Sequence, residues 1–201
     1  MRVQETEMNI QNWFRSDEHF NKLYDPSIRA LAYRHWTPLD VARKAASFLA
    51  AEKNVRILDI GSGVAKFCLA GAYFHPESQF FGVEQRKNLI VQSEIARLKL
   101  GLENVRLIHA NFTRLDFRDY DHFYFFNSFF ENLSGAGKID ESIEYSEQLY
   151  NYYNRYLYRQ LEHKPPGTRL ATYYGSGDEI PDSYHIVGTA MNQQLKFWVK
   201  V

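Results

Sequence analysis

The chain has 201 residues, of which 45% are hydrophobic and 24% are charged, and this places it among soluble globular proteins of one domain. Its 24 basic and 24 acidic residues give a formal net charge of zero. A neutral chain lacks the overall basic field of a protein held to nucleic acid through phosphates, so the composition argues against nucleic acid as a partner.

The cysteine content and the hydropathy of the sequence indicate the cellular compartment of the protein. Cys68 is the single cysteine and cannot form an internal disulfide, which favours a reducing compartment. The sequence contains neither a signal peptide nor an apolar run of membrane-spanning length. We therefore expect a cytoplasmic protein with no membrane partner.

The N-terminal residues predict helices. Residues 5–24 are polar with apolar side chains interspersed, which indicates one or two short amphipathic helices. Thr37 then resembles an N-cap, Pro38 suits the first helical position, and a helix is predicted to about residue 51. We expect residues 1–52 to form a helical segment that packs on or caps a core made of residues 53–201.

Residues 55–65 predict a buried strand, a glycine turn and the start of a helix. The apolar run over residues 55–60 is typical of a central parallel strand that is covered on both faces. Gly61 and Gly63 permit φ values and a close backbone approach that a Cβ would forbid. The following helix, predicted over residues 64–73, would present free backbone N–H groups at its start. Such a turn is suited to holding a ligand.

Details of this turn select the kind of ligand. Lys66 stands where a dinucleotide fingerprint requires its third glycine, and the P-loop pattern is absent. Asp59, at the strand end, would repel a pyrophosphate but suits a ligand with an ammonium group. The next strand, residues 80–83, is followed by Glu84, which is placed to accept hydrogen bonds from two ribose hydroxyls. The glycines alone would fit a purely structural turn, but the two acids favour a nucleoside cofactor.

The rest of the chain alternates predicted strands and helices. This alternation predicts an α/β fold with a doubly wound, mostly parallel sheet of seven strands and an N-terminal helical extension. The remaining elements are helices over residues 86–100 and 140–163, strands over residues 105–110, 121–126 and 169–174, and an antiparallel hairpin of residues 184–188 and 195–201.

Four short motifs stand at or near the ends of the predicted strands: Ile-Leu-Asp-Ile-Gly-Ser-Gly-Val at 57–64, Phe-Gly-Val-Glu at 81–84, Ala-Asn-Phe at 110–112 and Asn-Ser-Phe-Phe at 127–130. They resemble the motifs of the class I, seven-stranded S-adenosylmethionine-dependent methyltransferases, and most of all those of the non-SET histone-lysine type. The resemblance covers roughly residues 55–132. It implies a Rossmann-like methyltransferase fold with S-adenosylmethionine as cofactor.

Cofactor contacts follow from the resemblance. The first carboxylate is expected near the methionine ammonium, the glycines under the cofactor, and the second acid on the ribose. An amide oxygen after the third strand would receive the adenine amine, with an aromatic ring packed on the base, although Asn is also a common turn residue. The expected cofactor-binding residues are Asp59, Gly61, Ser62, Gly63, Glu84, Asn111, Phe112 and Asn127.

Catalytic and substrate residues also follow from the resemblance. At the exit of the fourth strand, an Asn127 carbonyl oxygen would orient an acceptor N–H, and Phe129 and Phe130 would form an apolar wall beside the sulfonium. The segment before the first strand, with Tyr33, Trp36 and Thr37, would close over the substrate. The alternative is that Trp36 is a packed aromatic residue and Thr37 only a cap.

The expected function is methyl transfer to an unidentified acceptor, either a protein side-chain amine or a small amine. The chain lacks a basic flank for chromatin, so a histone is not the predicted substrate. No metal is predicted. The alternative function is a non-catalytic binding or scaffold domain that has kept the fold.

Overall fold

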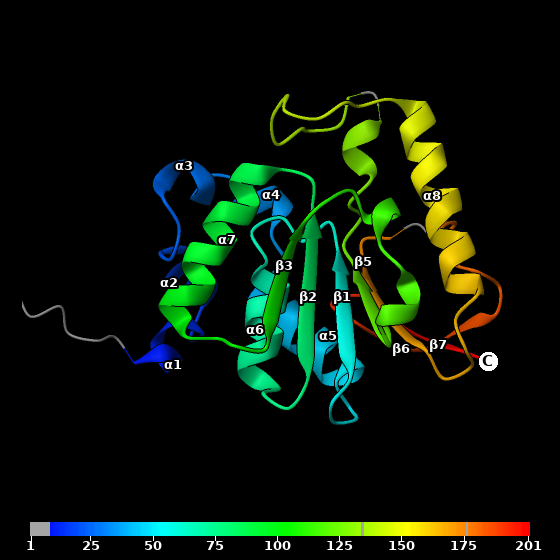
Figure 1. The fold of residues 1–201 in the computed structure, drawn as a ribbon, viewed down its shortest axis with the longest axis horizontal. Helices are drawn as coiled ribbons and strands as arrows, with labels where there is room; N and C mark the ends of the chain where they lie inside the picture. Colours follow the sequence, from blue (N-terminus) through cyan, green and yellow to red (C-terminus); the bar gives the residue numbers. More distant parts are fainter. Residues whose placement is uncertain (1–8, 134, 176) are drawn as a thin grey trace, which may run out of the picture.

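The computed structural model describes residues 9–133, 135–175 and 177–201. Within these residues seven strands form one sheet in the order β3-β2-β1-β4-β5-β7-β6 (Figure 1). The pairs among the first five strands are parallel, and β7 lies antiparallel between β5 and β6. The predicted doubly wound sheet with its closing hairpin is confirmed. The strands are β1 (Arg56–Ile60), β2 (Gln79–Glu84), β3 (Val105–His109), β4 (His122–Phe125), β5 (Arg169–Tyr173), β6 (Tyr184–Ala190) and β7 (Leu195–Lys200).

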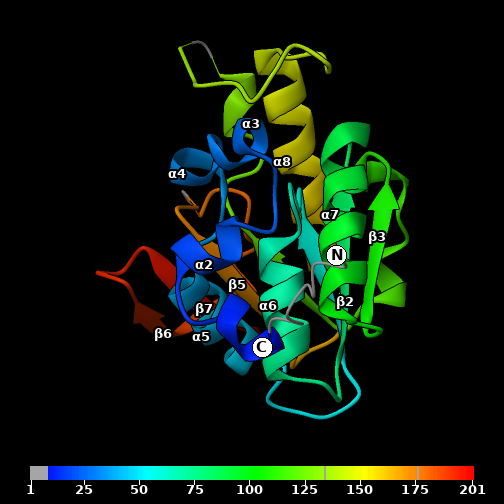
Figure 2. The ribbon, with the colours of Figure 1, turned by 90° about the vertical axis from the view of Figure 1, so that its left-hand side faces the viewer.

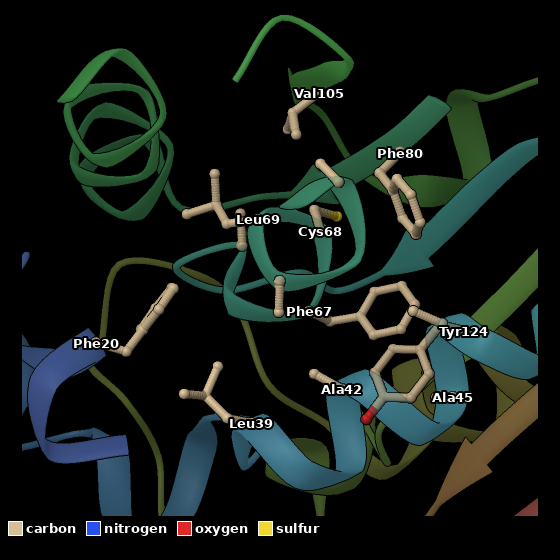
Figure 3. Close-up of a cluster of buried hydrophobic side chains, with 14 of the residues drawn as sticks. Phe20, Leu39, Ala42, Ala45, Phe67, Cys68, Leu69, Phe80, Val105 and Tyr124 are labelled. Atoms are coloured by element: carbon tan, nitrogen blue, oxygen red, sulfur yellow. The ribbon is translucent and has the colours of Figure 1, made fainter. Parts of the chain in front are cut away.

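Alternate residues of the strands serve two separate cores, because side chains of a strand point to opposite faces. On β4, Tyr124 belongs to one hydrophobic cluster, whereas Phe123 and Phe125 belong to the other. The first cluster is covered by α5 (Leu39–Leu49), α6 (Lys66–Phe74) and α7 (Lys87–Leu100). In its centre the rings of Phe67 and Tyr124 stack at 3.9 Å (Figure 3).

The second face is covered by short 3-10 turns and by α8 (Glu147–Glu162). The turns are η1 (Phe112–Arg114), η2 (Phe117–Asp119) and η3 (Phe130–Asn132). Tyr153, Leu157 and Leu161 form the buried stripe of α8 at helical spacing. In Figure 1, α8 lies at the right of the sheet and α7 at the left.

The N-terminal segment packs on the core as short helices. They are α1 (Ile10–Trp13), α2 (Asp17–Asn21), α3 (Pro26–Arg29) and α4 (Ala32–His35). The Tyr24 hydroxyl donates to the carbonyl of Val64 at 2.8 Å, which ties this segment to the glycine turn. Figure 2 shows α3 and α4 at the same end of the sheet as α8. Part of the predicted 5–24 helical stretch, residues 5–8, lies outside the described residues.

The predicted N-cap at Thr37 is wrong. Its buried hydroxyl pairs with the hydroxyl of Tyr124 at 3.0 Å, and α5 begins at Leu39 after Pro38. The N–H of Leu39 instead donates to the Asp17 carboxylate at 2.9 Å. A residue from α2 therefore supplies the cap that the local sequence pattern assigned to Thr37.

Two helices also begin later than predicted. The helix after the glycine turn starts at Lys66 rather than residue 64, because Ala65 adopts a left-handed conformation with φ 60°. The last helix starts at Glu147 rather than residue 140, with Ser146 as its N-cap. Among the described residues, no helix is both long and apolar enough to cross a membrane.

Candidate functional site

A cavity of about 350 Å³ opens at the carboxyl ends of β1, β2 and β4. In doubly wound sheets, ligands bind at this edge, where the strand order reverses. The wall consists of the β1–α6 turn, the ends of β2 and β3, and the segments around residues 126–132 and 137–145. Arg34, Trp36 and Thr37 of the N-terminal segment complete the wall.

The two positions of the turn require glycine for different structural reasons. Gly61 has φ +75°, and a Cβ at this position would lie 2.5 Å from the Cβ of Ser128, whose hydroxyl donates to the Ile60 carbonyl at 2.6 Å. Gly63 has φ +53°, and no atom of the described structure lies within 4 Å of the place of its Cβ. Gly61 therefore lets the chain after β4 approach, and Gly63 leaves open space beside the cavity.

Asp59 is the buried carboxyl group of the cavity wall. The pKa of Asp59 is raised to about 8, mainly by burial; the hydrogen bond from Cys68 opposes this rise, and the nearby charge of Glu84 adds to it. The Cys68 thiol donates to Oδ2 of Asp59 at 3.7 Å, and the thiol is itself buried. Asp59 is thus poised to ionise when a positive group comes near it.

Glu84, at the end of β2, is oriented by backbone donors. One carboxylate oxygen accepts from the N–H of Gly63 at 3.1 Å, and the other accepts from the N–H of Arg86 at 2.9 Å. Burial raises the pKa of Glu84, and the hydrogen bonds and charge of Arg86 oppose this rise. The glycine turn and the end of β2 are therefore joined through one carboxylate.

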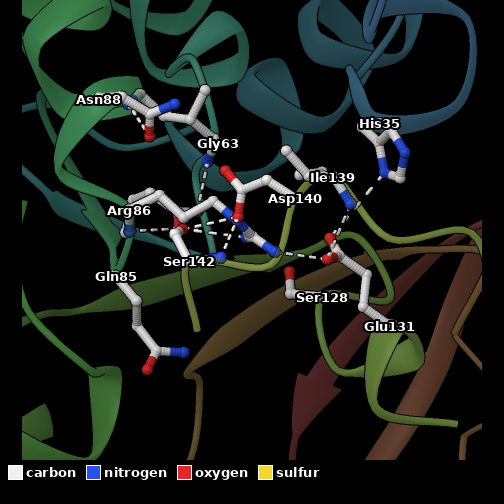
Figure 4. Close-up of polar contacts among 12 residues, drawn as sticks. His35, Gly63, Gln85, Arg86, Asn88, Ser128, Glu131, Ile139, Asp140 and Ser142 are labelled. Carbon is white, nitrogen blue, oxygen red and sulfur yellow. Dashed lines mark hydrogen bonds and ion pairs between the residues drawn. The ribbon is translucent and has the colours of Figure 1, made fainter. Parts of the chain in front are cut away.

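Arg86 links Glu84 to the segment that precedes α8 (Figure 4). Its buried guanidinium pairs with Glu131, lies 3.3 Å from Asp140 and donates to the Tyr145 hydroxyl at 2.7 Å. Glu131 also accepts from the backbone N–H of Ile139. The segment over the cavity is therefore held down by a charged network, which the sequence analysis did not identify. Its signal in the sequence was small, namely a basic residue two positions after Glu84.

Aromatic rings form another part of the cavity wall. Phe112 and Phe129 stack with their ring centroids 5.0 Å apart, and Tyr153 of α8 packs against both. Asn127, two residues before Phe129, has an unusual positive φ of 42°, a strained conformation of the kind found at functional sites. Phe130 also lines the cavity, and 48% of its surface is exposed.

Most of the predicted site residues line this one cavity. They are Asp59, Gly61, Ser62, Gly63, Glu84, Phe112, Asn127, Phe129 and Phe130, together with Trp36 and Thr37.

Two predicted site residues, Asn111 and Tyr33, are not part of the cavity wall. Asn111 is outside the cavity wall, and its amide oxygen already accepts from the N–H and the hydroxyl of Thr113. Both lone pairs are thereby used, so this oxygen cannot receive an adenine amine in this arrangement. Tyr33 is 95% exposed and also lies outside the wall, because it projects from the outer side of α4.

Lys66, which replaces the third glycine of a dinucleotide motif, anchors the N-terminal helices. Its side chain is only 3% exposed, and its ammonium donates to Asp17 at 2.5 Å and to Asn21 at 3.0 Å. The same ammonium lies 5.7 Å from the centre of the Trp36 ring. Burial lowers the pKa of Lys66, and the Asp17 carboxylate opposes this change. Trp36 and Thr37 are thus both packed residues and part of the cavity wall.

These features fit S-adenosylmethionine. The Ser62 hydroxyl is buried in the wall without a hydrogen-bond partner among the described residues, which leaves a polar atom for a ligand. Open space at Gly63, a carboxylate on each side of the turn and the ring of Phe112 suit an amino-acid nucleoside with a positive charge.

Comparison with known proteins finds similarity to methyltransferases. Residues 51–145 match a family model described as a methyltransferase domain. A tRNA (guanine-N(7)-)-methyltransferase of Synechococcus sp. strain JA-3-3Ab is 44% identical over 54 residues, which are 27% of this chain and 23% of that protein. The chain thus spans about a quarter of the length of such curated relatives.

Solved structures show the same fold at low sequence identity. TrmN from Thermus thermophilus has a TM-score of 0.60 at 17% identity, with 87% of this chain and 52% of that chain covered. An RNA methyltransferase from Salinibacter ruber, in complex with S-adenosyl-L-homocysteine, has a TM-score of 0.56 at 15% identity, with 82% and 92% covered.

These comparisons correct two expectations. The argument against nucleic acid as a partner is wrong, because the curated relatives are tRNA methyltransferases. Net charge was a poor guide, since it sums over the whole chain whereas recognition uses one surface. The closer resemblance to the non-SET histone-lysine type is not supported either. The sheet order is that of the Rossmann-like methyltransferase fold, and the domain model that matches residues 51–145 is that of a methyltransferase domain.

Proposed function

We propose that this chain transfers a methyl group from S-adenosylmethionine to a nucleophilic nitrogen of an RNA base. The observation that carries the methyl transfer is the pair of buried carboxyl groups, Asp59 and Glu84, on the two sides of the glycine turn at one cavity. The RNA acceptor is supported by the names of the relatives, tRNA (guanine-N(7)-)-methyltransferases.

Each cofactor residue has a physical task in this proposal. Asp59 accepts the ammonium of the methionine part and becomes ionised in doing so, because an opposite charge lowers the pKa that burial has raised. Glu84, already oriented by Gly63 and Arg86, accepts the ribose hydroxyls. The ring of Phe112 packs on the adenine.

The acceptor meets the methyl group at the exit of β4. When bound, S-adenosylmethionine supplies a methyl group on a sulfonium centre, which is already electrophilic. The protein then has to align the nucleophile and exclude water, and alignment alone can contribute up to about 7–11 kcal/mol. Asn127 would orient the acceptor through its amide, and Phe129 would shield the reacting atoms.

An unprotonated ring nitrogen such as N7 of guanine suits the charges in this cavity. Its lone pair attacks without losing a proton, so a general base is not required. The carboxylates of the wall have other partners: Asp59 pairs with Cys68, and Glu84 and Glu131 pair with Arg86. This arrangement favours binding and alignment over proton transfer.

A primary amine on a protein side chain or a small molecule is the second candidate acceptor. The observation in its favour is that Asn127 lines the cavity together with Phe112 and Phe129, and an amide oxygen can accept from an amine N–H. An amine must arrive neutral, which requires loss of a proton before attack. A scaffold domain that binds the cofactor without catalysis would retain Asp59 and Glu84 but transfer nothing.

The experiment uses radiolabelled S-adenosylmethionine with three acceptors: an unmodified tRNA transcript, an unfractionated protein extract and a mixture of small amines. We expect label in the tRNA and, after digestion, in a methylated purine. Asp59→Ala and Glu84→Ala should abolish binding of S-adenosylhomocysteine in calorimetry, whereas Glu77→Gln, an exposed acid, should not. Label in protein or amines alone would refute the RNA acceptor, and binding without transfer to any acceptor would favour the scaffold.

A further inference from the structure

The outward side of α8 carries tyrosines and arginines that the fold does not use. Tyr152, Arg155, Tyr158 and Arg159 are spaced by three and four residues, so they lie on one side of the helix, here called the α8 face. Tyr152 is 48% exposed and Tyr158 is 36% exposed, and both arginines are exposed.

Packing does not explain the α8 face. The core contacts of the helix are made by Tyr153, Leu157 and Leu161, which lie on its other side. Large aromatic side chains on the solvent side of a helix are therefore available to a partner. Tyr145, which precedes α8, differs from these tyrosines because its hydroxyl belongs to the Arg86 network.

The middle of the α8 face is positively charged. The helix carries a glutamate at each end, Glu147 and the exposed Glu162, but residues 148–161 between them contain no aspartate or glutamate. Within the described part of the chain, the guanidinium groups of Arg155 and Arg159 have no ion pair, hydrogen bond or ring contact, whereas Arg86 and Arg118 are each paired with carboxylates. Free guanidinium groups next to exposed rings suit a partner with both phosphates and aromatic bases.

The α8 face adjoins the cavity. The ring of Tyr152 lies 5.7 Å from that of Tyr153, which lines the cavity. One turn further, the Tyr156 hydroxyl donates to the carbonyl of Thr113, and the exposed Arg114 follows directly. A strand that leaves the cavity along α8 would therefore meet tyrosines and arginines in succession.

We propose that the α8 face binds a strand of the RNA acceptor, with Arg155 and Arg159 on phosphates and Tyr152 and Tyr158 stacked on unpaired bases. This proposal rests on the proposed function, since it assigns a binding surface to the same acceptor. It explains how a chain of zero net charge binds RNA, because the positive charge is local.

The test compares two double variants that remove the same charge. Arg155→Gln/Arg159→Gln alters the α8 face, and Arg43→Gln/Lys44→Gln alters exposed residues of α5 on the opposite side of the sheet. Binding of a fluorescently labelled, unmodified tRNA transcript is measured by anisotropy between 50 and 200 mM salt. Methyl transfer to the same transcript and calorimetry with S-adenosylhomocysteine are measured on the same samples.

We expect the α8 double variant to bind the transcript about tenfold more weakly, with a slope of log K against log salt smaller by about 1.4, which is two contacts at about 0.7 each. Tyr152→Ala should weaken binding by about tenfold without changing the salt slope. The KM for RNA should rise in these variants, while kcat and the affinity for S-adenosylhomocysteine stay unchanged. The α5 double variant should match the wild type.

Different results separate the two proposals. If the wild type methylates RNA and both double variants bind it equally well, the α8 face is not the RNA surface, and the proposed function stands. If the wild type neither binds nor methylates the transcript but binds S-adenosylhomocysteine, the RNA acceptor and the α8 face are both refuted. Binding of an acidic polypeptide in place of RNA would assign the α8 face to a protein partner and overturn the proposal.

Discussion

Replacement of Asp59 by Asn tests the electrostatics of the site directly. Asp59 is buried, and its pKa of about 8 compares with 3.8 for an unperturbed aspartate. The change of about four units corresponds to about 6 kcal/mol against ionisation in the folded protein, at 1.36 kcal/mol per unit. The amide of Asn has nearly the same shape but does not titrate in this range.

The sign of the effect on stability follows from proton binding. Between pH 4 and 8 the unfolded chain has an ionised Asp59 and the folded chain a protonated one, so the folded state binds more protons. The free energy of unfolding of the wild type should therefore fall, relative to Asp59→Asn, by about 1.4 kcal/mol per pH unit over this range. The difference should become constant above pH 8.

The assay is urea unfolding of both proteins at pH 5, 6, 7 and 8 without cofactor. Because other titrating groups are common to both proteins, the difference isolates Asp59. Glu77→Gln is the control at an exposed acid, and its free energy of unfolding should depend on pH as that of the wild type does. Parallel curves for wild type and Asp59→Asn would refute the assignment of a protonated carboxyl group in the folded protein.

The same residue predicts how cofactor binding depends on pH. If the ligand ammonium requires an ionised Asp59, the affinity of the wild type for S-adenosylhomocysteine should rise up to tenfold per unit between pH 6 and 8. Above pH 8 the rise should end, because Asp59 is then ionised in the free protein as well. Asp59→Asn should bind weakly and without the rising limb, and calorimetry distinguishes these outcomes.

Three further variants test other parts of the site. Gly61→Ala should lower the free energy of unfolding by about 3 kcal/mol, because the new Cβ meets Ser128 and the backbone is left-handed. Gly63→Ala should lower it by only about 1 kcal/mol but should abolish cofactor binding, because its Cβ enters the cavity. Lys66→Met should cost about 2 kcal/mol and speed proteolysis of the N-terminal helices, measured against the wild type. Arg86→Lys should raise the Kd for S-adenosylhomocysteine about tenfold, because an ammonium cannot reproduce the forked contacts of the guanidinium.

Each of these variants has a result that contradicts its premise. Equal stabilities for Gly61→Ala and Gly63→Ala would mean that Ser128 moves aside without cost. An unchanged protease pattern in Lys66→Met would show that other contacts hold the N-terminal helices. Unchanged affinity in Arg86→Lys would separate the Arg86 network from the cofactor site.

The central part of the fold was predictable because its determinants are local. An apolar run, an acid and two glycines lie within residues 55–63, and a second acid, Glu84, ends the following strand. Parallel strands bring their carboxyl ends to one edge of a sheet, so Asp59 and Glu84 had to lie close together. The sheet order then confirmed this neighbourhood.

Local rules failed where a distant residue competed for the same group. Thr37 had the sequence pattern of a helix cap, but Tyr124 takes its hydroxyl and Asp17 supplies the cap. Asn111 had an amide suited to adenine, but Thr113 uses both lone pairs of its oxygen. In each case the side chain can form hydrogen bonds with several possible partners, and the tertiary structure decides which of them it meets.

By itself the sequence determined the α/β class, the strand, turn and helix around Gly61 and Gly63, and the placement of Asp59 and Glu84 at the ends of successive strands, since strand periodicity and turn chemistry act over a few residues. Only the tertiary structure decided that Arg86 joins Glu84 to Glu131, Asp140 and Tyr145, and that Lys66 fastens the N-terminal helices to the cavity wall. Apart from Glu84, the partners of Arg86 and Lys66 are 45 to 59 residues away along the chain. No periodic pattern in the sequence encodes contacts over such a separation.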